Sequence, residues 1–206
     1  MTTILQNKLD EKFTAWIIKY ISPNFIDGIY LVWFTDNDAE STDKLLTFEN
    51  GKIFSSKNIE NIKLEIKNEK NEIENYERII SWLNEEINKD STEDNFYDIK
   101  FLLDQIEQNN FSIDVIELFT NYINLFGDYA RQDEKNNFLL TFESQSSIQK
   151  LWNYYYEAIF LPRFNNKKEF ENSKPAYLEI DKSELHLQLS EIINEFDSQI
   201  QVSSIY

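Results

Sequence analysis

Glycine and proline are scarce in this chain, which has three of each among 206 residues. Sharp turns depend on these residues, because glycine tolerates positive φ and proline fixes φ. A sandwich or barrel of many short strands needs frequent tight turns, so the scarcity disfavours both folds. The 41% hydrophobic and 15% aromatic content is ample for a core and argues against wholesale disorder. We therefore expect a folded, helix-rich chain.

Two regions have the pattern of β-strands. The run from Ile29 to Phe34 is continuously apolar, which predicts a strand covered on both faces. Residues 44–49 and 52–55 flank Asn50-Gly51, a dipeptide that accepts positive φ at both central positions of a turn, and they predict a β-hairpin. The pentapeptide of residues 45–49 recurs at residues 139–143. We interpret the two copies as strands with similar burial rather than as an internal duplication.

Most of the remaining chain repeats apolar residues at helical spacing. A bend is predicted at Gly127 and a polar loop over residues 165–175. No linker rich in glycine, proline or serine divides the sequence. The predicted fold class is α+β, with a small antiparallel sheet and a β-hairpin packed by several α-helices in a single domain, residues 1–206. Helices are predicted over residues 10–21, 59–62, 73–87, 97–108, 113–126, 148–159 and 184–200.

Few residues in the chain carry reactive chemistry. The absence of cysteine excludes disulfides, thiolate nucleophiles and zinc–sulfur sites, and the single histidine, His186, indicates a surface or packing role. The segment Asp36-x-Asp38-x-Glu40 resembles the start of a calcium loop, but Ser41 and Thr47 stand where that template needs glycine and glutamate. We expect no cofactor, no metal and no catalysis. A carboxylate-based enzyme is the alternative that so many acidic residues leave open.

The charge of the chain is strongly negative. Asp and Glu number 37 against 20 Lys and Arg, a formal net charge of -17. This charge repels phosphate backbones, so we expect no direct binding of nucleic acid. Residues 1–13 lack the pattern of a signal peptide, and the longest apolar run is too short to span a bilayer, so we expect no membrane contact and a cytoplasmic location. An acidic surface attracts cationic partners; solubility alone is the other interpretation.

The acidic residues form three groups along the chain. The first occupies residues 36–43, the second residues 65–77 and the third residues 85–98. Asp128, which follows Gly127, is interpreted as a helix cap. From the first and third groups we expect the residues that bind a partner to be Asp36, Asp38, Glu40, Asp43, Glu93, Asp94 and Asp98.

Three segments resemble a group of bacterial immunity proteins, CdiI-like proteins of contact-dependent growth inhibition and related polymorphic toxin systems. Residues 45–54 match a hairpin that leads into a helix, and residues 97–103 match a tyrosine–aspartate–apolar helix start. Residues 121–130 are similar to a helix with the order asparagine–aromatic–x–asparagine–leucine–phenylalanine–x–aspartate. The C-terminal third departs from the group, which has a more polar segment there with glycine and proline, where this chain has only Leu161-Pro162-Arg163.

The resemblance implies a cytosolic inhibitor without catalysis of its own that binds the toxin domain of a matching effector. Many such toxins are basic nucleases. We therefore predict an immunity protein that neutralises a cognate basic nuclease toxin domain by covering its substrate-binding surface. The alternative from the residues alone is an acidic nucleic-acid mimic or adaptor that binds a basic host protein.

Overall fold

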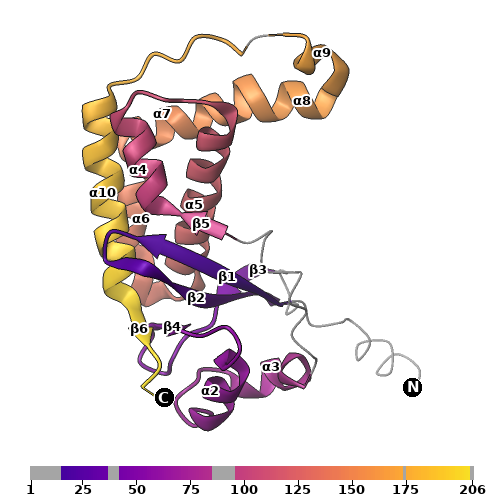
Figure 1. Cartoon of the computed structure of the whole chain (residues 1–206), viewed down its shortest axis with the longest axis vertical. Coiled ribbons are helices and arrows are strands. Elements are labelled where there is room, and N and C mark those ends of the chain that lie inside the picture. The colour runs from indigo at the N-terminus through magenta and orange to yellow at the C-terminus, as the bar shows by residue number, and fades with distance from the viewer. Residues whose placement is uncertain (1–14, 37–41, 85–95, 174, 205–206) are drawn as a thin grey trace. The chain divides into compact units, whose positions relative to one another are not determined.

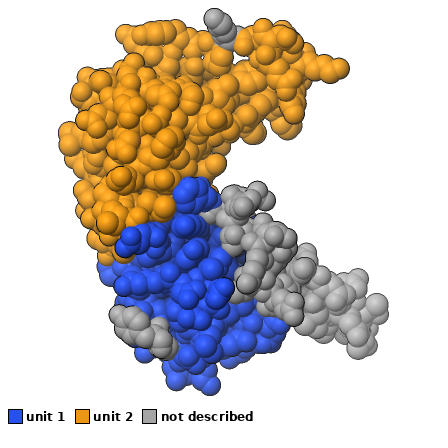
Figure 2. Space-filling model, viewed as in Figure 1, with its two compact units in different colours: residues 1–20, 27–96, 199–206 blue, residues 21–26, 97–198 orange. Residues whose placement is uncertain are grey.

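The computed structural model describes residues 15–36, 42–84, 96–173 and 175–204 (Figure 1). The fold is α+β, as the sequence predicted. The chain forms two compact units (Figure 2). Unit 1 comprises residues 1–20, 27–96 and 199–206, and unit 2 comprises residues 21–26 and 97–198. Whether the two units make a single domain stays a prediction.

The strands of the described residues form one six-stranded sheet in the order β5-β1-β2-β4-β6, with β3 also paired to β2. β2 is antiparallel to β3 and to β4, with Trp33 opposite Leu45 and Tyr30 opposite Ser56. β4 and β6 are parallel. The sheet is therefore mixed, which corrects the antiparallel prediction. The strands are β1 (Ala15–Ser22), β2 (Phe25–Asp36), β3 (Thr42–Leu45), β4 (Ile53–Ser56), β5 (Phe96–Asp98) and β6 (Ile200–Val202).

β1 lies where the sequence predicted a helix over residues 10–21, and that prediction is wrong for the described part. The segment carries isoleucine at positions 17, 18 and 21, whose branched side chains favour a pleated strand over a helix. The next strand confirms its prediction: Leu31 and Val32 point to opposite faces of β2 and are both 0% exposed. A continuous apolar run thus marks a strand that is buried on both sides.

The hairpin around Asn50-Gly51 is present, but its loop has three residues rather than two. Phe48 N–H donates to Lys52 O at 2.8 Å, and Gly51 N–H donates to Phe48 O at 2.8 Å. Only Gly51 has positive φ (82°); Asn50 does not. A three-residue loop needs only one residue in the left-handed region, and Gly51 fills that position. The loop is therefore compatible with the right-handed twist of the two strands without a second positive φ.

The core of unit 1 lies between the sheet and two short helices, α2 (Ile62–Asn68) and α3 (Tyr76–Leu83). Val32, Phe34 and Phe54 of the sheet belong to one buried cluster with residues of both helices. The helix predicted over residues 73–87 is confirmed as α3 with shifted boundaries; residues 85–87 lie outside the described part of the chain. The helix predicted over residues 59–62 is wrong in position, because residues 59–61 form a turn and α2 begins only at Ile62. The helical members of the cluster are Ile62, Ile66, Ile79, Trp82 and Leu83.

Unit 2 is helical, and its core is aromatic. Phe196 of α10 is fully buried and meets Tyr122 and Tyr129 edge-on, with ring centroids 6.0 and 6.1 Å apart. The predicted helices 97–108, 113–126, 148–159 and 184–200 are confirmed in type, except that residues 97–98 belong to β5 and Ile200 begins β6. The elements are α4 (Ile99–Glu107), α5 (Ile113–Gln132), the 3₁₀-helix η2 (Glu134–Leu139), α6 (Leu140–Glu143), α7 (Ser146–Tyr154), the π-helix η3 (Tyr155–Phe160), α8 (Leu161–Asn165), α9 (Lys167–Glu171) and α10 (Lys182–Gln199).

Four predictions in unit 2 are wrong. Gly127 does not bend the chain, because α5 continues through it to Gln132, and Asp128 lies inside that helix rather than at its terminus. Residues 139–143, predicted as a strand, are helical, and only Leu139 among them is buried. The predicted loop 165–175 contains α9, whose start is capped by Asn166 through the Glu169 N–H.

No helix among the described residues is both long and apolar enough to cross a membrane.

Candidate functional site

The structure gives two of the predicted partner-binding acids a structural role. Asp43 lies on β3, half-buried, and accepts a hydrogen bond from Thr35 Oγ1 at 2.8 Å. Asp98 caps α4 by accepting from Phe101 N at 2.8 Å, and it belongs to the other unit. Asp36 ends β2 opposite Thr42 in the strand pairing. Asp38, Glu40, Glu93 and Asp94 lie outside the described residues.

The most distinctive surface feature of unit 2 is a row of aromatic rings along α7, η3 and α8, which follow one another as one helical rod (Figure 1). Trp152, Tyr156, Phe160 and Phe164 are each four residues apart, and we call them the aromatic ladder. Successive ring centroids are 5.2, 5.4 and 6.0 Å apart. Exposure rises along the ladder, to 36% at Phe160 and 77% at Phe164. Phe164 therefore presents most of its ring to solvent.

The π-helix keeps the ladder on one face of the rod. In an α-helix, a residue four positions on is rotated by about 40°. The wider π turn between Tyr155 and Phe160 offsets part of this drift. The cause of the wider turn is in the sequence: Pro162 has no N–H, and its ring would clash with the carbonyl four residues earlier. The Leu161 N–H accordingly bonds to Tyr156 O, five residues back.

A neighbouring tyrosine ring and an ion pair to α5 hold the ladder in place. Tyr155 packs beside it, with ring centroids 5.4 Å from Tyr156 and 6.1 Å from Phe160. Arg163 of α8 forms an ion pair with Glu117 of α5, and the hydrogen bond to Glu117 raises the pKa of Arg163. Burial raises the pKa of the Tyr155 phenol, and the Glu117 carboxylate raises it further. The ladder is thus fixed to α5 rather than standing alone.

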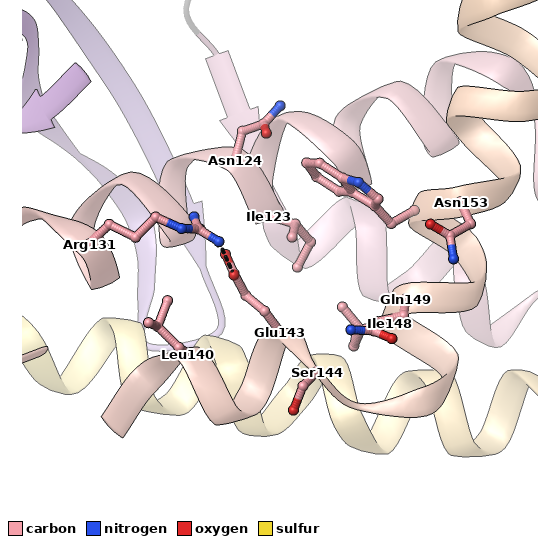
Figure 3. Close-up of a pocket in the computed structure, with 10 residues that line it drawn as sticks. Ile123, Asn124, Arg131, Leu140, Glu143, Ser144, Ile148, Gln149 and Asn153 are labelled. Atoms are coloured by element: carbon pink, nitrogen blue, oxygen red, sulfur yellow. Dashed lines mark hydrogen bonds and ion pairs between the residues drawn. The ribbon is translucent and has the colours of Figure 1, made fainter. Parts of the chain in front are cut away.

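A pocket of about 570 Å³ opens beside the first rung of the ladder, between α5, α6 and α7 (Figure 3). Trp152 lines it, so ladder and pocket are continuous. On one side Arg131 and Glu143 reach toward each other and form an ion pair, with Nη1 and Oε1 3.3 Å apart. The other polar groups of the lining are uncharged amides and one hydroxyl. They are Asn124, Gln149, Asn153 and Ser144.

Gly127 makes room for this ion pair. A Cβ built at position 127 would lie far inside van der Waals contact of Glu143 Oε1 and Arg131 Nη1. Glycine costs about 1 kcal/mol in a helix interior relative to alanine. The space above Gly127 is therefore occupied by the charged ends of two side chains from α5 and α6. This explains a glycine inside a helix that the sequence alone suggested was a bend.

The ladder and the pocket present groups that make non-covalent contacts. Partly exposed aromatic rings stack on apolar or cationic groups, and amides donate and accept hydrogen bonds. Within the described residues, no group of three or more His, Cys, Asp or Glu side chains lies close enough to hold a metal ion. These features favour a surface that binds another molecule.

The ladder was not predicted from the sequence, although the sequence contains a signal for it. Residues 152–164 hold eight aromatic or large aliphatic side chains, far more than the single buried stripe of a surface helix. Ile159 occupies the core position and is 0% exposed. The apolar side chains in excess of the buried stripe therefore face solvent. Apolar density beyond what one face can bury was the available indicator of an exposed patch.

No known family model matches this chain, and no curated protein matches it. Among solved structures the fold is similar to that in the crystal structure of the SatS C-terminal domain in complex with bromine. The TM-score is 0.58 with 14% sequence identity, and the match covers 91% of this chain and 93% of that one. At this identity the likeness concerns the fold alone. The chain therefore shares an α+β architecture with that domain.

Proposed function

We propose that this chain is a cytoplasmic immunity protein that binds and neutralises a basic toxin domain, with the aromatic ladder as its main contact. The observation that carries the proposal is the exposed end of the ladder, where Phe160, Leu161 and Phe164 lie together and are 36%, 46% and 77% exposed. Contiguous exposed apolar groups of this kind commonly mark interaction sites. The finer assignment, an inhibitor of a nuclease, rests on the sequence resemblance and on the charge of -17.

Aromatic rings suit the role of anchor. Each buries a large area in an interface and loses little conformational entropy, because few torsion angles are fixed. The rings of Phe160 and Phe164 are stacked, with planes 17° apart, and the ring of Tyr155 packs against that of Phe160. A prearranged contact needs less ordering on binding, so its affinity is higher for the same area.

The negative charge has a separate effect, on the rate of association. Acidic residues outnumber basic ones in both units. Near the ladder, by contrast, opposite charges are paired, as in Arg163–Glu117 and Lys167–Glu171. The long-range field attracts a cationic partner, whereas the ladder slows its dissociation. Ladder substitutions should therefore act on the dissociation rate, and charge substitutions on the association rate.

The experiment uses the product of the neighbouring open reading frame as the probe. We expect tight one-to-one binding, measured by surface plasmon resonance, and loss of the probe's toxicity on co-expression. Phe164→Ser should raise the dissociation rate about tenfold or more, as expected for an interface anchor. The matched control is Phe138→Ser, a 53% exposed phenylalanine on η2 outside the ladder, which should leave both rates unchanged.

The charge arm uses substitutions that keep the local hydrogen bonds. Asp43→Asn and Asp98→Asn retain an acceptor for Thr35 Oγ1 and for Phe101 N, yet each removes one negative charge. They should lower the association rate at low salt and leave the dissociation rate unchanged. A harmless neighbouring product, together with recovery of a DNA-binding host protein from lysate, would replace the proposal with the nucleic-acid mimic. Equal kinetics of Phe164→Ser and Phe138→Ser would remove the ladder from the interface.

A further inference from the structure

Two glutamates of unit 1 are buried where the sequence suggested a solvated acidic face. Glu65 lies on α2 and Glu69 is the C-cap residue of that helix, one turn further on, and each of the two residues is only 7% exposed. The neighbouring acids Glu72 and Glu74 are exposed. Residues four apart on a helix occupy the same face, so the two carboxyl groups are neighbours inside the protein.

Both carboxyl groups face the C-terminal end of the chain. Glu69 Oε1 accepts from the N–H of Ser204 at 3.2 Å and from its hydroxyl at 3.4 Å. Ser203 N–H donates to Ser55 O at 2.7 Å and so extends the pairing of β6 with β4. The second oxygens, Glu65 Oε2 and Glu69 Oε2, have no hydrogen-bond partner among the described residues.

The strand residues beside the pair carry no positive charge that could compensate the two carboxylates. β4 and residues 200–204 contain no ionisable side chain, only apolar residues, serine and Gln201. On α2 itself, Lys63 directs its ammonium group to Trp82, donating to the Trp82 carbonyl and lying 4.4 Å from the ring centroid. Two like charges in a buried site repel each other, and an unpaired buried carboxylate is costly.

We propose that the buried pair of Glu65 and Glu69 attaches the C-terminal segment to α2, and that ionisation of Glu65 beside Glu69 weakens this attachment. While Glu65 is protonated, the buried site carries no more than one negative charge. When Glu65 ionises, a second negative charge is buried beside Glu69 and the end of β6.

The direction of the pKa agrees with this arrangement. Burial raises the pKa of Glu65; hydrogen bonds from Ser56 and Ser203 lower it in part, and the charge of Glu69 raises it again. A carboxyl group whose pKa is raised by folding stabilises the folded state at low pH. This stability is lost as the pH rises from the ordinary value of 4.5 through the folded-state value.

The consequence is a sheet edge that responds to pH. β6 ends the strand order and is parallel to β4 over three residue pairs. Ionisation of Glu65 beside Glu69 weakens the contact of Ser204 with α2. Exchange of the Ser204 amide hydrogen should therefore accelerate with pH beyond its intrinsic chemical increase.

The test compares Glu65→Gln, which imitates the protonated acid, with Glu72→Gln, which removes one exposed charge from the same region. Urea unfolding is followed from pH 5 to pH 8. We expect the wild type and Glu72→Gln to lose stability along parallel curves, whereas Glu65→Gln loses less. Each unit by which the pKa is raised corresponds to a tenfold change in the folded-to-unfolded ratio.

A second measurement does not depend on any variant. Carboxyl ¹³C chemical shifts of the wild-type protein should show Glu65 titrating above its ordinary pKa. Parallel curves for both variants, with ordinary titration of the Glu65 carbon, would overturn the proposal. A rise in the unfolding midpoint with added Ca²⁺ or Mg²⁺ that Glu65→Gln abolishes would also overturn it, because a cation rather than a proton would then occupy the site.

Discussion

Alanine at position 127 tests whether the glycine inside α5 is present for the ion pair above it. The new Cβ would contact Glu143 Oε1 and Arg131 Nη1, which are the far ends of flexible side chains and can move away. The backbone of α5 is regular at this position, and φ of Gly127 is not positive. The substitution therefore sets a gain in helix propensity against the loss of one ion pair.

The two effects can be compared in magnitude. Alanine is favoured over glycine by about 0.8–1.0 kcal/mol in a helix interior. The ion pair joins a 59% exposed Arg131 side chain to a 17% exposed Glu143 side chain, and pairs of this exposure contribute about 0–1 kcal/mol. The expected net change of Gly127→Ala is therefore between about 0 and 1 kcal/mol, in the stabilising direction.

The assay is urea denaturation in two backgrounds. In a chain with Arg131→Ala and Glu143→Ala, the Cβ at position 127 meets no charged group, and Gly127→Ala should give the full stabilisation of about 1 kcal/mol. In the wild-type background the gain should be smaller, and the difference measures the ion pair. Destabilisation beyond about 1 kcal/mol in the background without the pair would refute the reasoning, because another packed group must then occupy the space.

The remaining predictions concern single elements of unit 2. Phe196→Ala removes the shared ring of the aromatic core and should cost about 3–5 kcal/mol in urea unfolding; a cost near 1 kcal/mol would mean that the core repacks. Asp98→Ala should cost about 1 kcal/mol through loss of the α4 cap, whereas Asp98→Asn should be nearly neutral. Pro162→Ala should restore an α-helical hydrogen bond and remove the π turn, which amide exchange and Cα shifts would detect. Burial raises the pKa of Tyr97 and of Tyr129 to about 12, so stability should fall as pH rises from 10 toward 12; spectrophotometric titration of both near 10 would contradict this.

An identical pentapeptide shows how far local sequence determines structure here. Leu45–Glu49 contributes β-strand and bridge residues and is buried over its first four positions, whereas Leu139–Glu143 is helical. The first copy lies beside β2, with Leu46 N–H bonded to Val32 O. The second copy comprises the last residue of η2 and the four residues of α6, in the helical unit. The same side chains therefore adopt the conformation that their neighbours can complete.

The helices of unit 2 were predictable because their apolar residues repeat over many turns. α5 and α10 bury one continuous stripe each, which periodicity alone reveals. β1 was not predictable in this way, because its apolar residues satisfy both the strand and the helix spacing over so short a length. The sequence shows where the acidic residues stand in the chain. It does not show that Asp43 and Asp98 accept hydrogen bonds that stabilise β3 and α4.

The sequence by itself determined the α+β class, most helices of unit 2, the hairpin at Gly51 and the acidic character of the surface. These follow from composition, from periodicity and from local φ preferences, none of which needs a distant partner. Only the tertiary structure decided that Gly127 accommodates an ion pair, that Glu65 and Glu69 are buried, and that the aromatic ladder faces solvent. Each of these depends on which elements pack together, and a residue's burial is set by groups far away in the chain.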